Sequence, residues 1–528
     1  VVTATMVDKA TVDGDNAKLD KLIATSGGLK GTGNKINIEI DSEATTGGAA
    51  TTVAAESLID LNNRTTGEIS FTSNIDTIIG KAADVASVFA DSDDGTGTNT
   101  QIKNPGNLKV TISDVVVAEN LSATPPVQAD PGLVQAADLK TIHAAGTGDI
   151  TLTAVGLISG SYSDVEYVIV TNLAKFKNAE ADEVTITESI TAKQADNIAA
   201  ATNFTGHLTA TISDTAMSKF ADFTETGDAH VLTINIKDAS VKADELKALD
   251  AKTTGVITVD SGTVTGDMDD VASVYDAGAA KVAGLGNEAI TVTASDSITI
   301  AEANKLQNTY TTGLVTATID ASTKSELDVL ASSSNAFSVA LKTDKAYVAA
   351  DLKAIDGKTT GTVDASIVET ISGALSDVKA IYESNVAGGL TGLGNEAVTI
   401  TDEGSIAASD INYVNSNTSG SLTVNKATTI TGSLTEVKAA YAAYASGTIT
   451  GLGDEAIIIS DLAPSSSDVA EIKALTTGTV TVSLSGTSVT ASTLKTLDAD
   501  STEVVNAGGV TTITGTSADV KSIYESTG

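Results

Sequence analysis

The chain repeats itself, and internal repetition constrains the fold more than any other feature, because each copy must fold against its neighbours. One repeated unit has Asp or Glu followed by Val, with an apolar residue three positions after the Val and often an aromatic residue four positions after it. This spacing places the side chains on one face of a short helix. The copies begin at Asp84, Asp164, Asp270, Asp377, Glu436, Asp468 and Asp519.

A serine precedes the acid at Ser163, Ser376 and Ser467. Serine is a favoured N-cap residue, and an acid in the first turn interacts well with the helix dipole. We therefore predict that these serines cap helices and that the acids are helix-start residues. The alternative interpretation is that the acids form a row that binds cations.

A second unit ends in Thr-Thr-Gly or a similar turn, and alternating Thr and Val follow it, as in residues 256–259 and 480–482. This alternation with Gly punctuation is typical of strands. A third unit, Gly-Leu-Gly-Asn/Asp-Glu-Ala, begins at Gly284, Gly392 and Gly451 and also leads into an expected strand.

The spacing of the turns predicts the architecture. The turns end at Gly255, Gly313, Gly361, Gly420 and Gly478, with separations of 58, 48, 59 and 58 residues. These are near-multiples of about 24–30 residues, a length typical of one solenoid coil. We therefore predict a repeat solenoid of short β-strands with short α-helices. It should be elongated and curved or supertwisted, because adjacent helices need about twice the spacing of adjacent strands.

The repeat is regular over residues 236–528 and irregular over residues 1–235. Four of the five prolines lie between Pro105 and Pro131, and an Asp- and Gly-rich stretch precedes them. Such residues favour loops, so we predict a loop insertion near residues 91–135.

Composition narrows the classes of function. The 528 residues carry a formal net charge of −37, and 41% are hydrophobic, which is too many for a disordered acidic chain. Nucleic acid is excluded as a partner because phosphate binding needs a basic surface. The chain has no cysteine, and no apolar run is long enough for a transmembrane segment.

The acidic turns and one acidic loop are the candidate calcium sites, since calcium prefers oxygen ligands. The simpler reading of the Gly-Leu-Gly turns is that their glycines adopt positive φ while the Leu enters the core. The candidate ligands are Asp91, Asp93, Asp94, Asn287, Glu288, Asn395, Glu396, Asp454 and Glu455.

No residue pattern indicates catalysis. His143, His207 and His230 lie in different repeats without the spacing of metal ligands. The sequence contains no Gly-x-Ser-x-Gly motif, and we assemble no catalytic triad from it. We therefore expect a protein that is not an enzyme.

Units such as 350–361 and 513–520, joined by Gly-Leu-Gly-Asn-Glu-Ala, resemble the long repetitive exported proteins of marine cyanobacteria. That family includes large cell-surface and S-layer-like proteins, and many of its chains are associated with calcium. The resemblance implies an extracellular or cell-surface location. It brings no catalytic residues, and its calcium association falls on the acidic turns.

We expect a non-enzymatic extracellular structural protein, a subunit of a surface filament, sheath or S-layer. Its partners would be further copies of itself, meeting at solenoid ends or edges with calcium as a candidate cofactor, and surface polysaccharide. The alternative is an adhesin stalk or phage-type fibre, a binding module whose contact loop is residues 91–135.

Overall fold

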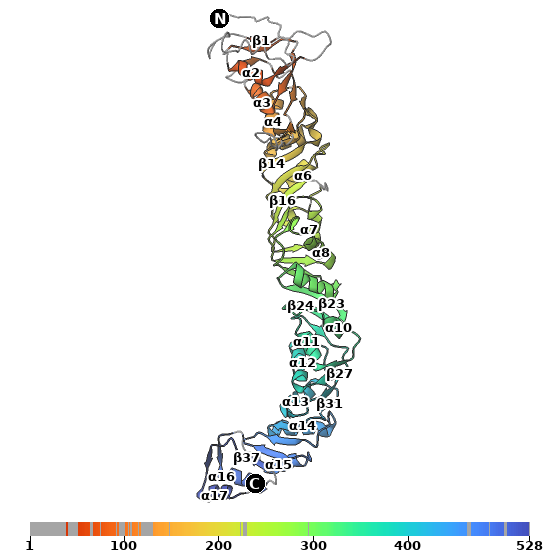
Figure 1. The fold of residues 1–528 in the computed structure, drawn as a ribbon, viewed down its shortest axis with the longest axis vertical. Coiled ribbons are helices and arrows are strands. Elements are labelled where there is room, and N and C mark those ends of the chain that lie inside the picture. Colours follow the sequence, from red (N-terminus) through yellow and green to blue (C-terminus); the bar gives the residue numbers. More distant parts are fainter. Residues whose placement is uncertain are drawn as a thin grey trace, which may run out of the picture. The chain divides into compact units, whose positions relative to one another are not determined.

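The structure is a computed structural model of an α/β protein with helices and mostly parallel strands (Figure 1). It describes residues 38–40, 51–63, 67–73, 75–90, 92–93, 101–103, 105, 108–114, 116–117, 130–146, 148–221, 223–224, 230–293, 295–461, 466–484, 486–500 and 504–526. The chain divides into two compact units, residues 1–262 with 272–285, and residues 263–271 with 286–528.

Among the described residues of the first unit, the strands form three parallel sheets and one antiparallel pair. The orders are β1 (Ile38–Ile40), β3 (Ile69–Phe71), β6 (Ile102–Lys103), β5 (Ser92–Asp93); β13 (Phe176–Lys177), β11 (Ile150–Leu152), β7 (Lys109–Ile112), β4 (Ile75–Gly80), β2 (Thr51–Ala54); and β10 (Leu133–Gln135), β12 (Leu157–Gly160), β14 (Glu183–Ile190), β15 (Leu208–Ile212), β16 (Val231–Ile236), β18 (Ile257–Val259), β20 (Val282–Ala283). The pair is β8 (Val116–Val117) with β9 (Asp130–Pro131), and β17 spans Ser240–Lys242.

The helices of this unit lie between the strands in the sequence. They are α2 (Ala55–Asn62), α3 (Ala82–Ala90), α4 (Ala136–Ala145), α5 (Tyr162–Val165), the π-helix η2 (Glu166–Thr171), the 3₁₀ turns η3 (Leu173–Lys175) and η4 (Ala179–Ala181), α6 (Ala192–Ala199), the 3₁₀ turn η5 (Met217–Lys219) and α7 (Ala243–Asp250). Helix α8 (Met268–Asp276) contributes residues to both units.

In the second unit, the strand orders are β19 (Thr263–Gly266), β21 (Ala289–Val292), β23 (Val315–Ser322), β24 (Ala336–Leu341), β26 (Val363–Asp364), β28 (Leu390–Thr391), with β22 (Ser297–Ile298) also on β23; β25 (Ala346–Val348), β27 (Thr370–Gly373), β29 (Ala397–Ile400), β31 (Leu422–Thr423), β33 (Ile449–Thr450); β30 (Ser405–Ala407), β32 (Thr429–Gly432), β34 (Ala456–Ile459), β35 (Val480–Ser483), β37 (Val504–Asn506); and β36 (Ser488–Thr490), β38 (Thr512–Thr514). The helices are α9 (Ile300–Lys305), the π-helix η6 (Leu306–Tyr310), α10 (Lys324–Leu327), α11 (Ala349–Asp356), α12 (Leu375–Ala387), α13 (Ala408–Asn417), α14 (Leu434–Ser446), α15 (Ser466–Lys473), α16 (Ala491–Asp500) and α17 (Ser517–Tyr524).

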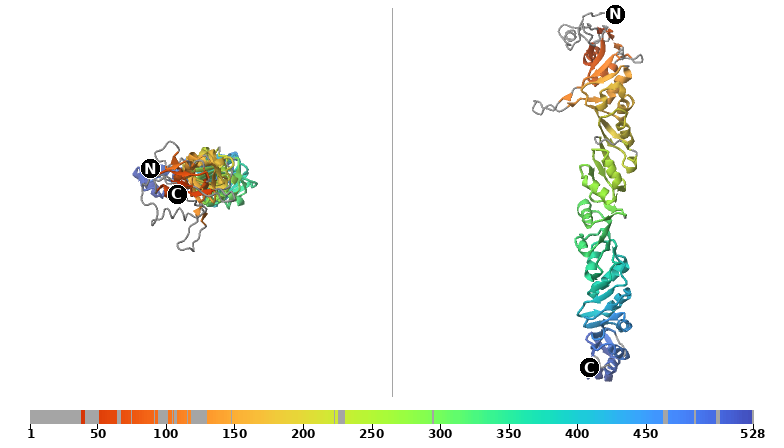
Figure 2. Two further views of the ribbon diagram at one scale, coloured as in Figure 1. Left: turned by 90° about the horizontal axis from the view of Figure 1, so that it is seen from above. Right: turned by 90° about the vertical axis from the view of Figure 1, so that its right-hand side faces the viewer.

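Parallel neighbours in the sheets are separated by one short crossover in the sequence (Figure 2). Ala346 pairs with Thr370, and Thr370 pairs with Ala397, which are separations of 24 and 27 residues. Parallel strands need a connection of about a dozen residues or more, and here a helix, its loops and a short strand of another sheet provide it. We call one strand–helix–strand crossover of this length a coil.

Buried apolar side chains stack from strand to strand in register. In one sheet Ile371 pairs with Val398, Val398 with Leu422, and Leu422 with Ile449, and all four are buried. The predicted helix faces pack against these stacks: Val378, Ile381 and Tyr382 of α12 are buried, which confirms the i, i+3, i+4 interpretation. Among the described residues, no helix is long and apolar enough to cross a membrane.

The Thr-Thr-Gly turns need their glycine because the chain passes close to the preceding coil. A Cβ atom on Gly420 would lie 2.1 Å from the carbonyl oxygen of Glu396. The Gly-Leu-Gly turns follow the simpler prediction: Gly392 has a φ of 84°, which favours glycine, and Leu393 is buried.

The prediction that Ser163, Ser376 and Ser467 are N-caps is wrong. Each of them is the second residue of its helix, α5, α12 or α15. The N-cap of α5 is Ser161, whose side chain accepts the backbone N–H of Asp164. In α12 the N-cap is Ala374, whose side chain has no acceptor, so this helix start must be satisfied from elsewhere.

Candidate functional site

The three glutamates of the Gly-Leu-Gly turns are buried, with exposed fractions of 4% for Glu288, 0% for Glu396 and 3% for Glu455. Each carboxylate accepts hydrogen bonds from backbone N–H groups of its own turn. For Glu396 the donors are Gly394, at 2.7 and 3.0 Å, and Asn395, at 3.2 Å. The turn thus wraps its backbone donors around its own acid, and the strand that follows begins immediately afterwards.

A buried tyrosine completes this arrangement in two of the copies. The hydroxyl of Tyr382 donates to Glu396 Oε2 at 2.7 Å, and the hydroxyl of Tyr441 donates to Glu455 Oε1. Burial, followed by the hydrogen bond to the Glu396 carboxylate, raises the pKa of Tyr382. Hydrogen bonds to an ionised acceptor are stronger than neutral ones, so each acid is held by its own protein groups.

The neighbouring predicted ligands have a different environment. Asn287, Asn395 and Asp454 are exposed, and the backbone N–H groups of all three face the adjacent glutamate. Within the described part of the chain, no group of three or more His, Cys, Asp or Glu side chains is arranged to hold a metal ion. The calcium assignment of these turns stays a prediction, while the glutamates have a structural role that the sequence did not reveal.

The acidic loop is only partly described. Asp93 lies in β5, where it pairs with Lys103 of β6, while Asp91 and Asp94 lie outside the described residues. Most of the predicted contact loop at residues 91–135 is outside them too.

A second group of acids, which sequence reasoning missed, caps helices of the preceding coil. Each lies just after a strand, and its carboxylate accepts the N–H of the first helix residue 21 to 32 positions earlier. The pairs are Ala82 with Asp114 at 3.0 Å, Ala192 with Asp214 at 2.8 Å, Met217 with Asp238 at 2.7 Å, Met268 with Asp296 at 2.7 Å, Leu375 with Asp402 at 2.7 Å, and Leu434 with Asp461.

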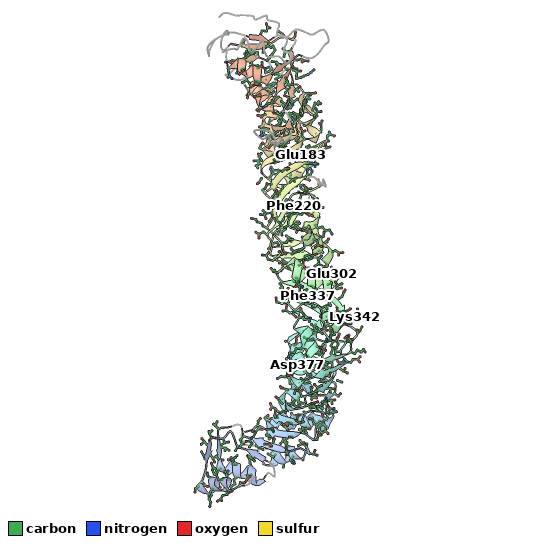
Figure 3. All side chains as sticks on the ribbon, viewed as in Figure 1. Glu183, Phe220, Glu302, Phe337, Lys342 and Asp377 are labelled. Carbon is green, nitrogen blue, oxygen red and sulfur yellow. The ribbon has the colours of Figure 1, made fainter. Side chains whose placement is uncertain are left out.

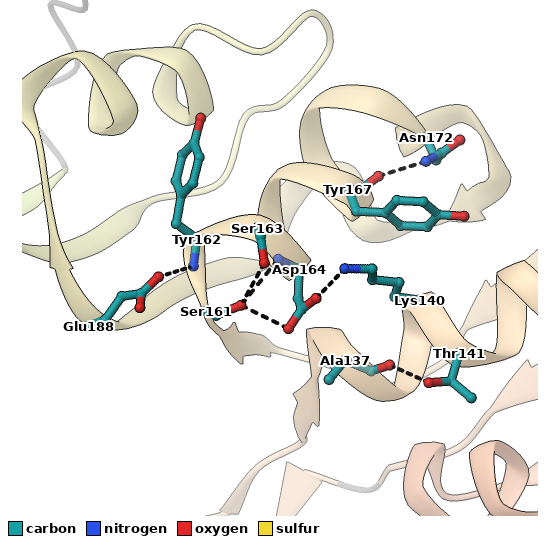
Figure 4. Close-up of polar contacts among 10 residues, drawn as sticks. All are labelled: Ala137, Lys140, Thr141, Ser161, Tyr162, Ser163, Asp164, Tyr167, Asn172 and Glu188. Carbon is teal, nitrogen blue, oxygen red and sulfur yellow. Dashed lines mark hydrogen bonds and ion pairs between the residues drawn. The ribbon is translucent and has the colours of Figure 1, made fainter. Parts of the chain in front are cut away.

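Four of the helix-start acids are paired with lysines of the preceding helix. Lys140 Nζ of α4 lies 2.6 Å from Asp164 Oδ1 of α5, beside Tyr167 (Figure 4). The hydrogen bond from Lys140, together with one from Ser161, lowers the pKa of Asp164. The same relationship joins Lys353 with Asp377 (labelled in Figure 3), Lys438 with Asp468, and Lys495 with Asp519, at 2.8, 2.7 and 3.2 Å.

This pairing bears on the cation-row interpretation of the helix-start acids. The positive charge beside these four acids is a lysine ammonium from the chain itself. Surface ion pairs of this kind contribute little individually, roughly 0–1 kcal/mol, but they align consecutive helices.

The three histidines lie in three unrelated environments, as their separation in the sequence suggests. His143 Nδ1 lies 2.8 Å from the Tyr167 hydroxyl, and burial, with a contribution from Lys175, lowers its pKa. His207 Nδ1 lies 2.9 Å from Glu183. His230 is buried, and its Nδ1 accepts the backbone N–H of Leu208 at 3.0 Å.

Comparison of the sequence with protein-family models finds no match, and comparison with curated proteins finds none either. The arguments about function therefore depend on the contacts described above.

Proposed function

We propose that the chain is a non-enzymatic extracellular structural protein, a subunit of a surface filament, sheath or S-layer. We further propose that the coils of each unit are turns of a solenoid of about 24–30 residues per turn. The observation that carries the proposal is the capping of one coil by the next, as in the hydrogen bond from Leu375 to Asp402.

This capping makes each coil dependent on its successor. A helix start that takes its acceptor from the following coil is satisfied only when that coil is in place. The Lys–Asp pairs and the in-register apolar stacks have the same nearest-neighbour character. Interactions of this kind suit a repeat protein, whose stability is the sum of the stabilities of its coils and of the interfaces between neighbouring coils. They also allow folded structure to propagate from one coil to the next.

We propose that the function of the chain is to continue this stacking of coils from one copy of the protein to the next. The strands of a parallel solenoid have unpaired N–H and C=O groups at the ends of their sheets, and such edges pair readily with another chain. A head-to-tail contact between copies is heterologous and produces a fibre when it does not close. The large negative charge opposes such contacts, so calcium or salt that screens it would promote them.

The test is electron microscopy and sedimentation velocity of the purified protein in millimolar calcium and in excess chelator. We expect ordered filaments or sheets, favoured by calcium. A protein that stays monomeric at high concentration under both conditions would refute the structural proposal. The alternative, an adhesin with a contact loop at residues 91–135, predicts that deleting this loop abolishes attachment while the coils stay folded.

A further inference from the structure

Asp182 in the first unit occupies the same place in its coil as the buried glutamate Glu396 in the second. Asp182 directly precedes β14, and Glu396 directly precedes β29. A Cβ atom on Gly206, in the turn of the following coil, would overlap the carbonyl oxygen of Asp182. A Cβ atom on Gly420 would overlap the carbonyl oxygen of Glu396 in the same way. The backbones of the two acids are therefore placed alike.

The carboxyl groups of these two acids have different surroundings. The Glu396 carboxylate accepts the backbone N–H of Gly394 and of Asn395 and the hydroxyl of Tyr382. Asp182 is also buried, with an exposed fraction of 8%, but its Oδ2 has no hydrogen-bond donor in the part of the chain that the structure describes. A buried carboxylate without donors is costly, so the coil of Asp182 favours the neutral acid.

The tyrosine that serves Glu396 has no counterpart beside Asp182. Tyr382 lies 14 residues before Glu396. The residue at the same spacing before Asp182 is Val168 of η2, and both it and the adjacent Ile169 are buried. An apolar side chain thus stands at the sequence position that carries the hydroxyl in the second unit.

The charged groups of the same turn and of the following coil do not pair with Asp182. Glu180, on the same turn, has the same charge as an ionised Asp182. Burial, followed by repulsion from Glu180, raises the pKa of Asp182 to about 6. Glu183 follows Asp182 directly, and its carboxylate lies 2.9 Å from Nδ1 of His207 in the next coil. The imidazole therefore pairs with Glu183 and not with Asp182.

The charged groups of the preceding coil and of η2 have other partners too. Lys177 Nζ of β13 lies 3.9 Å from Oδ2 of Asp149, which precedes β11. Glu166 of η2 accepts the hydroxyl of Tyr162 at 2.7 Å. The geometry thus leaves a buried acid without the partners that its equivalents in the second unit have.

The sheet beside Asp182 is irregular as well. Strand β14 lies between β12 and β15, and its pairing with β15 shifts register between Thr185 and Ser189. The ladder that would hold β14 against the next coil is therefore interrupted a few residues after the acid. We call residues 176–190, from β13 to the end of β14, the Asp182 segment.

We propose that the Asp182 segment is a pH-sensitive joint of the first unit, closed most firmly when the Asp182 carboxyl is protonated and opening locally when it is ionised. Opening admits water to the carboxylate, which hydrates the charge that the closed segment leaves without donors. This device is independent of self-assembly and goes beyond the structural function proposed above.

The direction of the response follows from the raised pKa of Asp182. The closed segment binds the proton more tightly than the open one, so protonation favours closure fully below about pH 4. This advantage is lost as the pH rises through about 6. The segment should therefore open more often at neutral pH than at acidic pH.

The experiment is hydrogen–deuterium exchange of the whole chain at pH 5 and pH 8, read by mass spectrometry and corrected for the intrinsic effect of pH on amide exchange. We expect the opening constant of the β14 amides to increase about tenfold between these values, because the closed form still holds most of the proton at pH 5. The amides of β29, which follows Glu396, are the internal reference for the general effect of pH.

Two variants assign the response to its residue. Asp182→Asn removes the titrating group with little change of volume, so the tenfold change in β14 should disappear. His207→Gln is the control, because imidazole titrates in the same pH range, and it should keep the change. Circular dichroism of each variant verifies that it is folded.

Two results would overturn the proposal. One is a wild-type chain in which opening of β14 changes with pH no more than opening of β29, and this result needs no variant. The other is a pH response that persists in Asp182→Asn or disappears in His207→Gln.

Discussion

The carboxylate of Asp402 accepts a 2.7 Å hydrogen bond from the backbone N–H of Leu375, a residue 27 positions earlier. Leu375 begins α12, and its N-cap Ala374 has no side-chain acceptor. Asp402 follows β29, which lies in register beside β27, the strand that leads into α12. The helix start is thus completed by the next coil, and the register of the sheet places the cap.

We predict that Asp402→Ala destabilises α12 by about 1 kcal/mol, the usual cost of losing an N-cap acceptor. Asp402→Asn keeps an acceptor oxygen and should cost less. Hydrogen exchange of the α12 amides measures the effect locally. Glu403→Ala is the control, since the Glu403 side chain is exposed and forms an ion pair with Lys426 at 3.5 Å. Equal protection of α12 in all three variants would contradict the capping role.

The glycine that ends the Thr418-Ser419-Gly420 turn is required by the limited space there. We predict that Gly420→Ala destabilises its coil by about 1–3 kcal/mol, because the new Cβ would overlap the carbonyl oxygen of Glu396 at 2.1 Å. Gly404→Ala is the matched control, since a Cβ there meets nothing within 4 Å and no unusual φ is required. Urea unfolding measures both variants, and similar midpoints would show that the turn relaxes without cost.

These two cases show what a sequence of this kind reveals. Helix faces and strands follow from local periodicity, so the buried face of Val378, Ile381 and Tyr382 was predictable. The Thr-Thr-Gly turn was also predictable, but the reason for its glycine was not, because Glu396 lies 24 residues away. A close contact between coils becomes visible only when the strand register is known.

The acids illustrate the same limit in the candidate site. Glu396 and Asp402 look alike in the sequence, yet one is enclosed by its own turn and the other caps a helix in the preceding coil. A turn whose oxygen atoms could bind calcium has the same composition as a turn whose acid accepts hydrogen bonds from backbone N–H groups.

The Tyr382–Glu396 pair gives a prediction that concerns the calcium assignment. Glu396→Ala leaves the buried Tyr382 hydroxyl and the Gly394 N–H without their acceptor, and we expect a loss of about 3 kcal/mol or more. Tyr382→Phe should cost about 1–2 kcal/mol. Thermal unfolding measures both variants with calcium and with chelator.

We expect the loss in Glu396→Ala to be the same under both conditions, because the partners of the carboxylate are protein groups. The double variant Tyr382→Phe/Glu396→Ala completes a cycle, and its coupling energy should be favourable. A penalty that vanishes when calcium is removed would instead show that Glu396 is a metal ligand.

Asp182 makes the stability of the fold decrease as pH rises. An acid whose pKa is lowered by an ion pair, such as Asp164, makes the stability increase instead. It is buried, with an exposed fraction of 8%, and its Oδ2 has no hydrogen-bond partner among the described residues. Burial, with repulsion from Glu180, raises the pKa of Asp182 to about 6. The folded state therefore holds the proton more tightly than the unfolded state, so stability falls as pH rises from about 4 to 6 and stays reduced above that.

We predict that Asp182→Asn stabilises the first unit at pH 7, by up to about 3 kcal/mol for a difference of two pKa units. At pH 4 the wild-type carboxyl is protonated in the fold, so the advantage of the amide should shrink towards zero. Urea unfolding of both proteins between pH 4 and pH 8 measures this convergence. Asp149→Asn in the same unit is the control, because Asp149 is half exposed and its ion-pair partner is the lysine Lys177 and not a histidine. A stability difference for Asp182→Asn that is the same at every pH would mean that the substitution acts through packing and not through the buried charge.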